Sequence, residues 1–252
     1  MLEQMAKERV LLKQIREKCN KTPQPGVSII VSTNKLKYID NILMNYMRSV
    51  YPNKELIIIL NNNKLNINNC KLKSIGLKDV QIFQLDERCA LGKCLNFGIE
   101  QTKFDYITKM DDDDYYAPNY LKDLMNVFKY TDAQVTGKAS HLVYFEGEHV
   151  LRIRQPNNEN RYTSFISGST ILAKKEVFDR VKFKSLECSE DREFCLDCVS
   201  AGIKMYSADI FNYIYMRHKN LLDHTWQSFS EEDSNNFRPF IVTRNFIPFL
   251  IV

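Results

Sequence analysis

The chain has 252 residues, of which 44% are hydrophobic and 26% are charged, and its formal net charge is +4. These values predict a globular protein of one domain or one compact two-part domain, and the small charge argues against a nucleic-acid partner. The N-terminal region is charged, and no apolar run approaches the roughly 20 residues that span a bilayer, so we expect neither a secretion signal nor a transmembrane helix. We therefore predict a cytoplasmic protein.

The seven cysteines are odd in number and irregularly spaced, so they predict no disulfide framework. Cys195 and Cys198 form a single CxxC pair, a spacing that also occurs in zinc sites. A zinc site of this type needs a second pair of ligands, and the two thiols fall within a predicted helix. Core packing is therefore favoured over a zinc site.

Residues 1–26 are expected to form an N-terminal arm. The first 21 residues have a ragged apolar face that predicts a helix, and two prolines in residues 22–26 predict a linker. The basic face of the helix is compatible with a membrane surface, but packing against the rest of the protein is the favoured interpretation.

Strands and helices alternate after this arm. Nearly continuous apolar runs at residues 27–31 and 55–60 predict strands buried on both faces. Apolar residues recur at helical spacing over residues 39–50, and a strand, a helix and a strand in this order predict a right-handed parallel unit. Further elements are expected as strands at residues 80–85 and 106–110 with a helix at 92–100 between them.

Three of these strands are followed by polar loops, at Ser32–Lys35, Asn61–Asn63 and Asp111–Asp114. The carboxyl ends of parallel strands meet at one edge of a sheet, where ligands bind, so we expect a site there. Side chains alternate along a strand, so Asp111 and Asp113 point the same way and offer oxygen ligands that suit Mg²⁺ or Mn²⁺. A solvated acidic loop is the alternative interpretation.

The second half of the chain has shorter elements. The patterns predict a hairpin of residues 141–145 and 149–154, a strand at 165–172 interrupted by Gly168, a helix capped by Ser189 and ending at Ala201, and strands at 204–207 and 211–216. Residues 229–238 predict a loop. The apolar residues 247–252 are compatible with packing on the core, with pairing to another subunit or with a longer parent chain.

Five stretches in order resemble the family 2 glycosyltransferases of the GT-A fold, namely Val27–Asn34, Glu55–Ile59, Leu91–Gly98, Met110–Asp114 and Ser189–Asp191. The resemblance implies an α/β protein with a Rossmann-like, mostly parallel central sheet flanked by helices and a smaller antiparallel acceptor-side sheet. It implies a domain at 27–226, with a nucleotide-sugar half at 27–118, an acceptor half at 119–226, and an extension at 227–252. Gly168–Thr170 and His224–Trp226 look most like bacterial spore-coat and cell-surface glycosyltransferases.

The same resemblance assigns roles to the acids. Asp111–Asp113 matches the DXD motif, in which Asp113 binds the metal, Asp111 assists it or contacts the donor, and Asp112 and Asp114 support them. Glu190–Asp191 matches the family's ED motif, whose Asp is the general base for the acceptor hydroxyl. Charge complementarity at a helix N-terminus is the alternative for this pair. Gly168, Ser169 and Trp226 are assigned with Glu190 to the acceptor side, and Ser32, Thr33 and Asn34 to the donor.

A late histidine often completes the metal site in GT-A enzymes. His224 is the favoured residue here, and His218 is the second candidate. The adjacent Arg217 is compatible with binding of a diphosphate, and a structural hydrogen-bonded histidine is the alternative for either ring.

The chain departs from the family at Asn61, where an Asp usually holds the nucleotide base. An amide oxygen accepts the N3–H of uracil or thymine, so UDP- or dTDP-sugars are the expected donors. Asp86, Arg88 and Lys93 are further donor-site candidates, with ordinary surface charge as the alternative.

The sequence therefore predicts a metal-dependent, inverting glycosyltransferase that acts in surface or spore-coat polysaccharide or glycoprotein synthesis. The sequence does not specify whether the acceptor is a glycan, a lipid-linked molecule or a protein. It also leaves open whether the chain forms a homo-oligomer. A non-catalytic module that binds a glycan or coat protein is the alternative. A nucleotidyltransferase is disfavoured because Ser32–Lys35 is not a glycine-rich phosphate loop.

Overall fold

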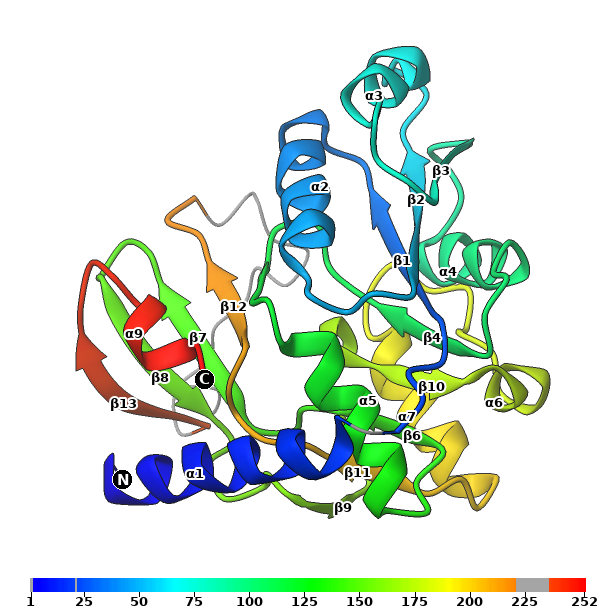
Figure 1. The fold of residues 1–252 in the computed structure, drawn as a ribbon. Coiled ribbons are helices and arrows are strands. Elements are labelled where there is room, and N and C mark those ends of the chain that lie inside the picture. Colours follow the sequence, from blue (N-terminus) through cyan, green and yellow to red (C-terminus); the bar gives the residue numbers. More distant parts are fainter. Residues whose placement is uncertain (1, 21, 221–235) are drawn as a thin grey trace.

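The computed structural model describes residues 2–20, 22–220 and 236–252 (Figure 1). In these parts of the chain, an eight-stranded sheet has the order β3-β2-β1-β4-β10-β6-β11-β9, and a five-stranded sheet has the order β13-β8-β7-β12-β5. Every helix in the described residues is too short or too polar to cross a membrane.

The first half of the large sheet is parallel, as predicted. Its strands are β1 (Val27–Thr33), β2 (Lys54–Asn61), β3 (Val80–Leu85) and β4 (Tyr106–Lys109). Helix α2 (Ile39–Arg48) joins β1 to β2, and α4 (Leu91–Glu100) joins β3 to β4. Residues that alternate along β1 pack into two separate cores, one shared with α2 and the other with α4, so the sheet is buried on both faces.

The second half of the sheet is mixed. It consists of β10 (Leu172–Lys174), β6 (Val135–Gly137), β11 (Met205–Ser207) and β9 (Arg161–Thr163), and β10 lies antiparallel to β4. Helices α5 (Tyr120–Tyr130), α6 (Lys175–Arg180) and α7 (Glu190–Ser200) cover this half. Cys195 and Cys198 of α7 are both buried in the core, which agrees with the packing interpretation of the CxxC pair.

The small sheet contains β5 (Tyr115–Tyr116), β7 (His141–Phe145), β8 (Val150–Arg154), β12 (Tyr213–Arg217) and β13 (Phe237–Val242). The expectation of an antiparallel sheet is wrong at one pair, because β7 and β12 are parallel. The chain leaves β7 through the hairpin to β8 and returns to β12 from the large sheet, so both strands enter from the same end (Figure 1).

Three local predictions differ from the structure. Residues 165–172 do not form one strand: Gly168–Thr170 form the 3₁₀ turn η2, and only Leu172 belongs to β10. Ser189 precedes α7 but makes no side-chain capping hydrogen bond, and its φ of 65° lies in the left-handed region. Helix α3 (Ile67–Lys73) was not predicted from the asparagine-rich loop, although the Asn66 side chain caps it.

The two ends of the chain pack together. Helix α1 (Leu2–Cys19) lies beside the short helix α9 (Ile247–Leu250), and Arg9 donates hydrogen bonds to the carbonyl oxygens of Ile251 and Phe249 at 2.8 and 2.7 Å. Leu250 is fully buried. The apolar C-terminal residues therefore pack on the core of the small sheet, which was one of the three predicted alternatives (Figure 1).

Candidate functional site

A cleft of about 490 Å³ opens at the carboxyl ends of β1, β2 and β4. It brings together most of the residues that the sequence singled out, from both halves of the chain. The predicted residues that line it are Ser32, Thr33, Asn34, Asn61, Asp111, Asp112, Asp113, Gly168, Ser169, Glu190 and Asp191.

The acidic loop is held from behind by amides of α2. The Asn41 side chain donates to the carbonyl oxygens of Asp112 and Asp114, at 2.8 and 3.0 Å, and Asn45 donates to that of Asp114 at 2.9 Å. Asp114 points away from the cleft into the small sheet, where it accepts hydrogen bonds from Tyr213 Oη at 2.6 Å and Met216 N at 2.9 Å. Asp114 thus anchors the loop between the two sheets.

The remaining acids crowd one wall of the cleft. Burial, followed by the charge of Asp113, raises the pKa of Asp112 to about 7, although Thr33 Oγ1 donates to its Oδ2 at 2.5 Å. Burial, followed by the charge of Asp111, likewise raises the pKa of Asp113 to about 7. Like charges this close oppose ionisation, and a cation beside them would relieve the repulsion.

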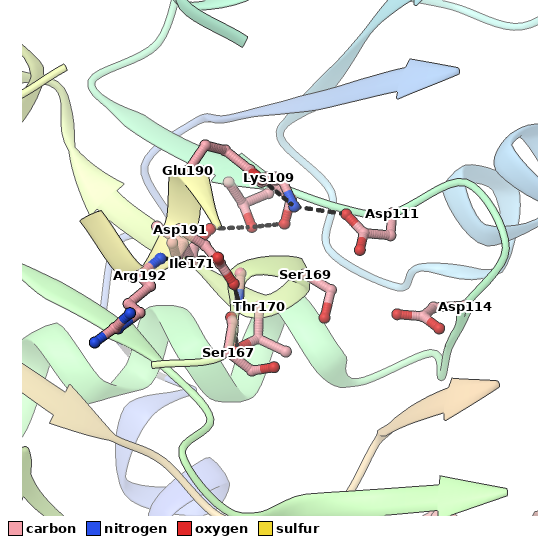
Figure 2. A network of polar contacts seen from close by, with 12 residues as sticks. Lys109, Asp111, Asp114, Ser167, Ser169, Thr170, Ile171, Glu190, Asp191 and Arg192 are labelled. Carbon is pink, nitrogen blue, oxygen red and sulfur yellow. Dashed lines mark hydrogen bonds and ion pairs between the residues drawn. The ribbon is translucent and has the colours of Figure 1, made fainter. Parts of the chain in front are cut away.

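Lys109 joins this wall to the opposite one (Figure 2). Its Nζ lies 2.7 Å from Asp111 Oδ1 and 3.6 Å from Glu190 Oε1, and its side chain is buried. Burial alone would lower the pKa of Lys109, but the charges of Asp111, Glu190 and Asp191 outweigh it and raise the pKa, so the ammonium group stays charged. Lys109 was not predicted as a site residue, although a lysine at the end of a buried strand directly before the acids was a signal for it.

Asp191 lies on the wall opposite the acidic loop, in the first turn of α7. Its Oδ2 accepts a hydrogen bond from Gly168 N at 3.1 Å, and its Oδ1 accepts one from Arg192 N at 2.8 Å. A Cβ at position 168 would lie 2.6 Å from Asp191 Cβ, so only glycine leaves room for this contact. Figure 2 shows Asp191 packed against the turn of residues 167–170, with Asp111 across the cleft.

Of the two candidate histidines, His218 lies beside the acids. Its Nε2 is 3.9 Å from Asp113 Oδ2, and its ring stacks on Tyr38 with 5.9 Å between ring centroids. The favoured His224 and the acceptor-side Trp226 lie outside the described residues. Arg217 is buried at the end of β12, where its carbonyl oxygen accepts a hydrogen bond from Glu146 N at 2.9 Å.

The donor-base candidates divide into two groups. Asn61 lines the cleft, where its Nδ2 donates to the carbonyl oxygen of Cys89 at 2.8 Å and its buried Oδ1 has no hydrogen-bond partner among the described residues. Asp86 and Arg88 instead pair with each other at 2.8 Å on the surface, and they do not line the cleft. Lys93 does not line it either.

The profile of glycosyl transferase family 2 matches residues 28–182 of this chain. The O-antigen biosynthesis glycosyltransferase WbnJ of Escherichia coli is 27% identical over 159 residues, which are 60% of this chain and 62% of WbnJ. An uncharacterized glycosyltransferase of Haemophilus influenzae is 25% identical over 185 residues, 69% of this chain and 72% of the relative. The chain thus spans less than two thirds of WbnJ.

Two solved structures share the fold. S. aureus TarS 1–349 in complex with UDP-GlcNAc superposes with a TM-score of 0.63 at 18% identity, over 83% of this chain and 64% of TarS 1–349. The mannosyltransferase PcManGT of Pyrobaculum calidifontis, in complex with GDP-Man and Mn²⁺, gives a TM-score of 0.62 at 14% identity, over 86% of this chain and 66% of PcManGT. These similarities confirm the predicted GT-A fold.

Proposed function

The chain belongs to glycosyl transferase family 2, and from this premise we propose that it moves a sugar from a nucleoside-diphosphate sugar to a hydroxyl group by a metal-dependent, inverting displacement. The observation that carries the proposal is the division of the cleft into two walls. One wall holds the crowded acids Asp111–Asp113, and the other holds Asp191 on a fixed turn. The first suits a metal-bound diphosphate, and the second suits a base.

The metal would be held by Asp113 and Asp111, with His218 as a third ligand. The described residues contain no ready-made group of three or more His, Cys, Asp or Glu side chains around a metal position. Mg²⁺ and Mn²⁺ fit such a site, because Mg²⁺ in particular is usually bound by one or two carboxylates together with substrate phosphates and water. When bound, the metal would neutralise the charge that develops on the leaving diphosphate.

Asp191 would take the proton from the acceptor hydroxyl as its oxygen forms a bond to the anomeric carbon. The bond from that carbon to the diphosphate oxygen breaks at the same time, and attack from the opposite face inverts the configuration. Because Gly168 N and Arg192 N hold both oxygens of Asp191, the carboxylate is oriented before the acceptor arrives. The proposed role of Glu190 is to hold Lys109 at the same wall.

Asn61 supports a donor with a uracil or thymine base. Its Nδ2 is already engaged with Cys89, so its Oδ1 is the atom left to accept the N3–H of such a base. An acceptor atom at this position therefore favours UDP- or dTDP-sugars as the donor. TarS was solved with UDP-GlcNAc, whereas PcManGT was solved with GDP-Man and Mn²⁺.

The proposed biological role is cell-surface polysaccharide or glycoprotein synthesis, with spore-coat synthesis as one form of it. It is supported by WbnJ, whose name places that relative in O-antigen biosynthesis. The acceptor class within this role is a glycan, a lipid-linked molecule or a protein. We place the reaction in the cytoplasm, where nucleotide sugars are available, with association with the inner membrane surface or the spore coat as part of the proposal.

A thermal-shift screen tests the donor. UDP-, dTDP-, GDP- and CDP-sugars are added with Mn²⁺, and the same series is repeated with a chelator. Ligands that bind the folded state raise the melting temperature, so UDP- or dTDP-sugars should do so only with the metal present. If none of the four classes of sugar nucleotide raised the melting temperature, donor binding would be contradicted. If the increase were the same with the chelator as with Mn²⁺, the metal dependence would be contradicted.

A further inference from the structure

We propose that Glu146 is a positioning residue for the metal site, which holds the imidazole of His218 so that Nε2 faces Asp113. The inference rests on the proposed function, because it takes His218 as a metal ligand. Glu146 lies on the hairpin between β7 and β8, far from the acidic loop in sequence, and no motif points to it.

The parallel pairing of β7 and β12 brings the two residues together. In this register Phe145 pairs with Arg217, so Glu146 and His218 are the next residues on neighbouring strands. Glu146 N donates to the Arg217 carbonyl oxygen at 2.9 Å, and Glu146 Oε2 accepts from Lys219 N at 3.2 Å. The backbone of Glu146 is thus fixed to the residue before His218, and its carboxylate is fixed to the residue after it.

The two ring nitrogens of His218 face different carboxylates. Nδ1 lies 3.4 Å from Glu146 Oε2, and Nε2 lies 3.9 Å from Asp113 Oδ2. A carboxylate at Nδ1 favours the tautomer that carries its proton there, which leaves the lone pair of Nε2 directed at Asp113. Two adjacent ligand atoms on one octahedral ion, each about 2.1 Å from it, are about 3 Å apart, so Nε2 and Asp113 Oδ2, which are 3.9 Å apart here, would approach each other by about 1 Å on binding a shared ion.

The other contacts of the ring restrict its rotation. Tyr38 stacks on His218 with an angle of 24° between the ring planes. The acidic loop is tied to the same strand, because β5 pairs with β12 and Asp114 accepts from Met216 N. Asp113, His218 and Glu146 therefore lie together at one end of neighbouring strands of the small sheet. The contact at Nδ1 needs to shorten by only about 0.5 Å to become a good hydrogen bond.

Glu148 provides a matched control on the same hairpin. Its carboxylate pairs with Arg152 at 2.7 Å, four residues along the chain, rather than with His218 or the acids. Removing Glu148 therefore changes the charge of the hairpin by the same amount as removing Glu146, without changing the environment of the imidazole.

The test is the affinity for Mn²⁺ alone, measured from the electron paramagnetic resonance signal of free Mn²⁺, and repeated with saturating UDP. Metal affinity should fall about tenfold or more in Glu146→Ala and less in Glu146→Gln, whose side chain still accepts a hydrogen bond. Glu148→Ala should match the wild type. Because Glu146 acts through His218, Glu146→Ala/His218→Ala should bind Mn²⁺ no more weakly than His218→Ala.

Unchanged affinity in Glu146→Ala, or losses that add in the double variant, would overturn the inference, and so would unchanged affinity in His218→Ala. Circular dichroism and the melting temperature establish that each variant is folded. The proposed function is tested separately by sugar transfer in the wild type. If the wild type transfers sugar but the variants do not show the predicted Mn²⁺ affinities, only the role of Glu146 is contradicted. If the variants show the predicted affinities but the wild type transfers no sugar, the proposed reaction is contradicted.

Discussion

Lys109 and Glu190 meet across the cleft, with the lysine Nζ 3.6 Å from Glu190 Oε1. The same nitrogen lies 2.7 Å from Asp111, so one buried cation links the acidic loop to the first residue of α7. The proposed metal side and base side are therefore joined through a single side chain. Its position at the end of β4, between β1 and β10, makes this link part of the central sheet.

Replacing Lys109 should destabilise the protein as well as reduce turnover. In Lys109→Met, the buried carboxylate of Glu190 and the partly exposed carboxylate of Asp111 lose their common cation. Breaking a fully buried pair costs about 3 kcal/mol of unfolding free energy, and solvent screening at Asp111 makes the expected loss smaller. Urea denaturation measures this change. Lys73→Met is the control, because its pair with Asp40 is exposed and contributes little. Equal stabilities of the two variants would contradict the role of Lys109.

Gly168→Ala should impair the reaction without impairing donor binding. The new methyl group would displace Asp191, whose Cγ lies 2.7 Å from its position, and a shift of about 1 Å in a reacting group costs about a hundredfold in rate. Turnover and the donor-induced thermal shift are measured on the same sample. In Gly147→Ala, the nearest atom is Lys219 Cγ at 3.4 Å, so this control should be active. Wild-type turnover in Gly168→Ala would show that Asp191 need not stay in place.

Asn61→Ala should weaken the preference of the protein for UDP over CDP. Loss of one hydrogen bond of about 1 kcal/mol reduces affinity for UDP about fivefold, and CDP, which has no N3–H to donate, should be unaffected. Isothermal titration with each nucleotide and Mn²⁺ measures both values. A parallel loss for UDP and CDP would mean that Asn61 shapes the cleft and does not recognise the base.

Stability should depend on His141 below about pH 6.5. Burial, followed by the charges of Arg154 and Lys138, holds the pKa of His141 well below its usual range. The unfolded chain therefore binds a proton that the folded protein does not, so the stabilising contribution of the neutral ring is fully present above pH 6.5 and is lost as the pH falls. The loss is at most about 1.4 kcal/mol per pH unit.

The comparison that isolates this effect is the free energy of unfolding of the wild type and His141→Phe at about pH 7.5 and 5.5. Phenylalanine retains a ring against Tyr213, which His141 contacts edge-on at 5.3 Å between centroids. The stability difference should shift in favour of the variant at the lower pH. The same difference at both values would place the protonation of His141 outside this range.

The parallel half of the sheet was predictable because its signals are local. The nearly continuous apolar runs at Val27–Val31 and Glu55–Leu60 are typical of strands buried on both faces, and β3 was predicted at its observed bounds. The acidic run follows β4, the next strand along the chain, so its place at the cleft followed from strand order alone.

The rest depends on contacts between distant residues. Lys109 interrupts an apolar pattern, and nothing local shows that Glu190 will approach it from a helix 81 positions later. Likewise, Asn41 and Asn45 look like ordinary polar positions of an amphipathic helix until the acidic loop packs on them. The strand predicted at residues 165–172 was wrong except at Leu172, because the expected interruption at Gly168 is a turn of residues 168–170 that accommodates Asp191.

The most direct test of the account is sugar-nucleotide turnover with Mn²⁺ in the wild type, Asp191→Asn and Asp113→Ala. Asp191→Asn should keep its donor-induced thermal shift and lose about a hundredfold or more in turnover, because it lacks the base. Asp113→Ala should lose both turnover and the Mn²⁺ dependence of donor binding. Full turnover in both variants would contradict a metal-dependent transferase that uses Asp191 as its base.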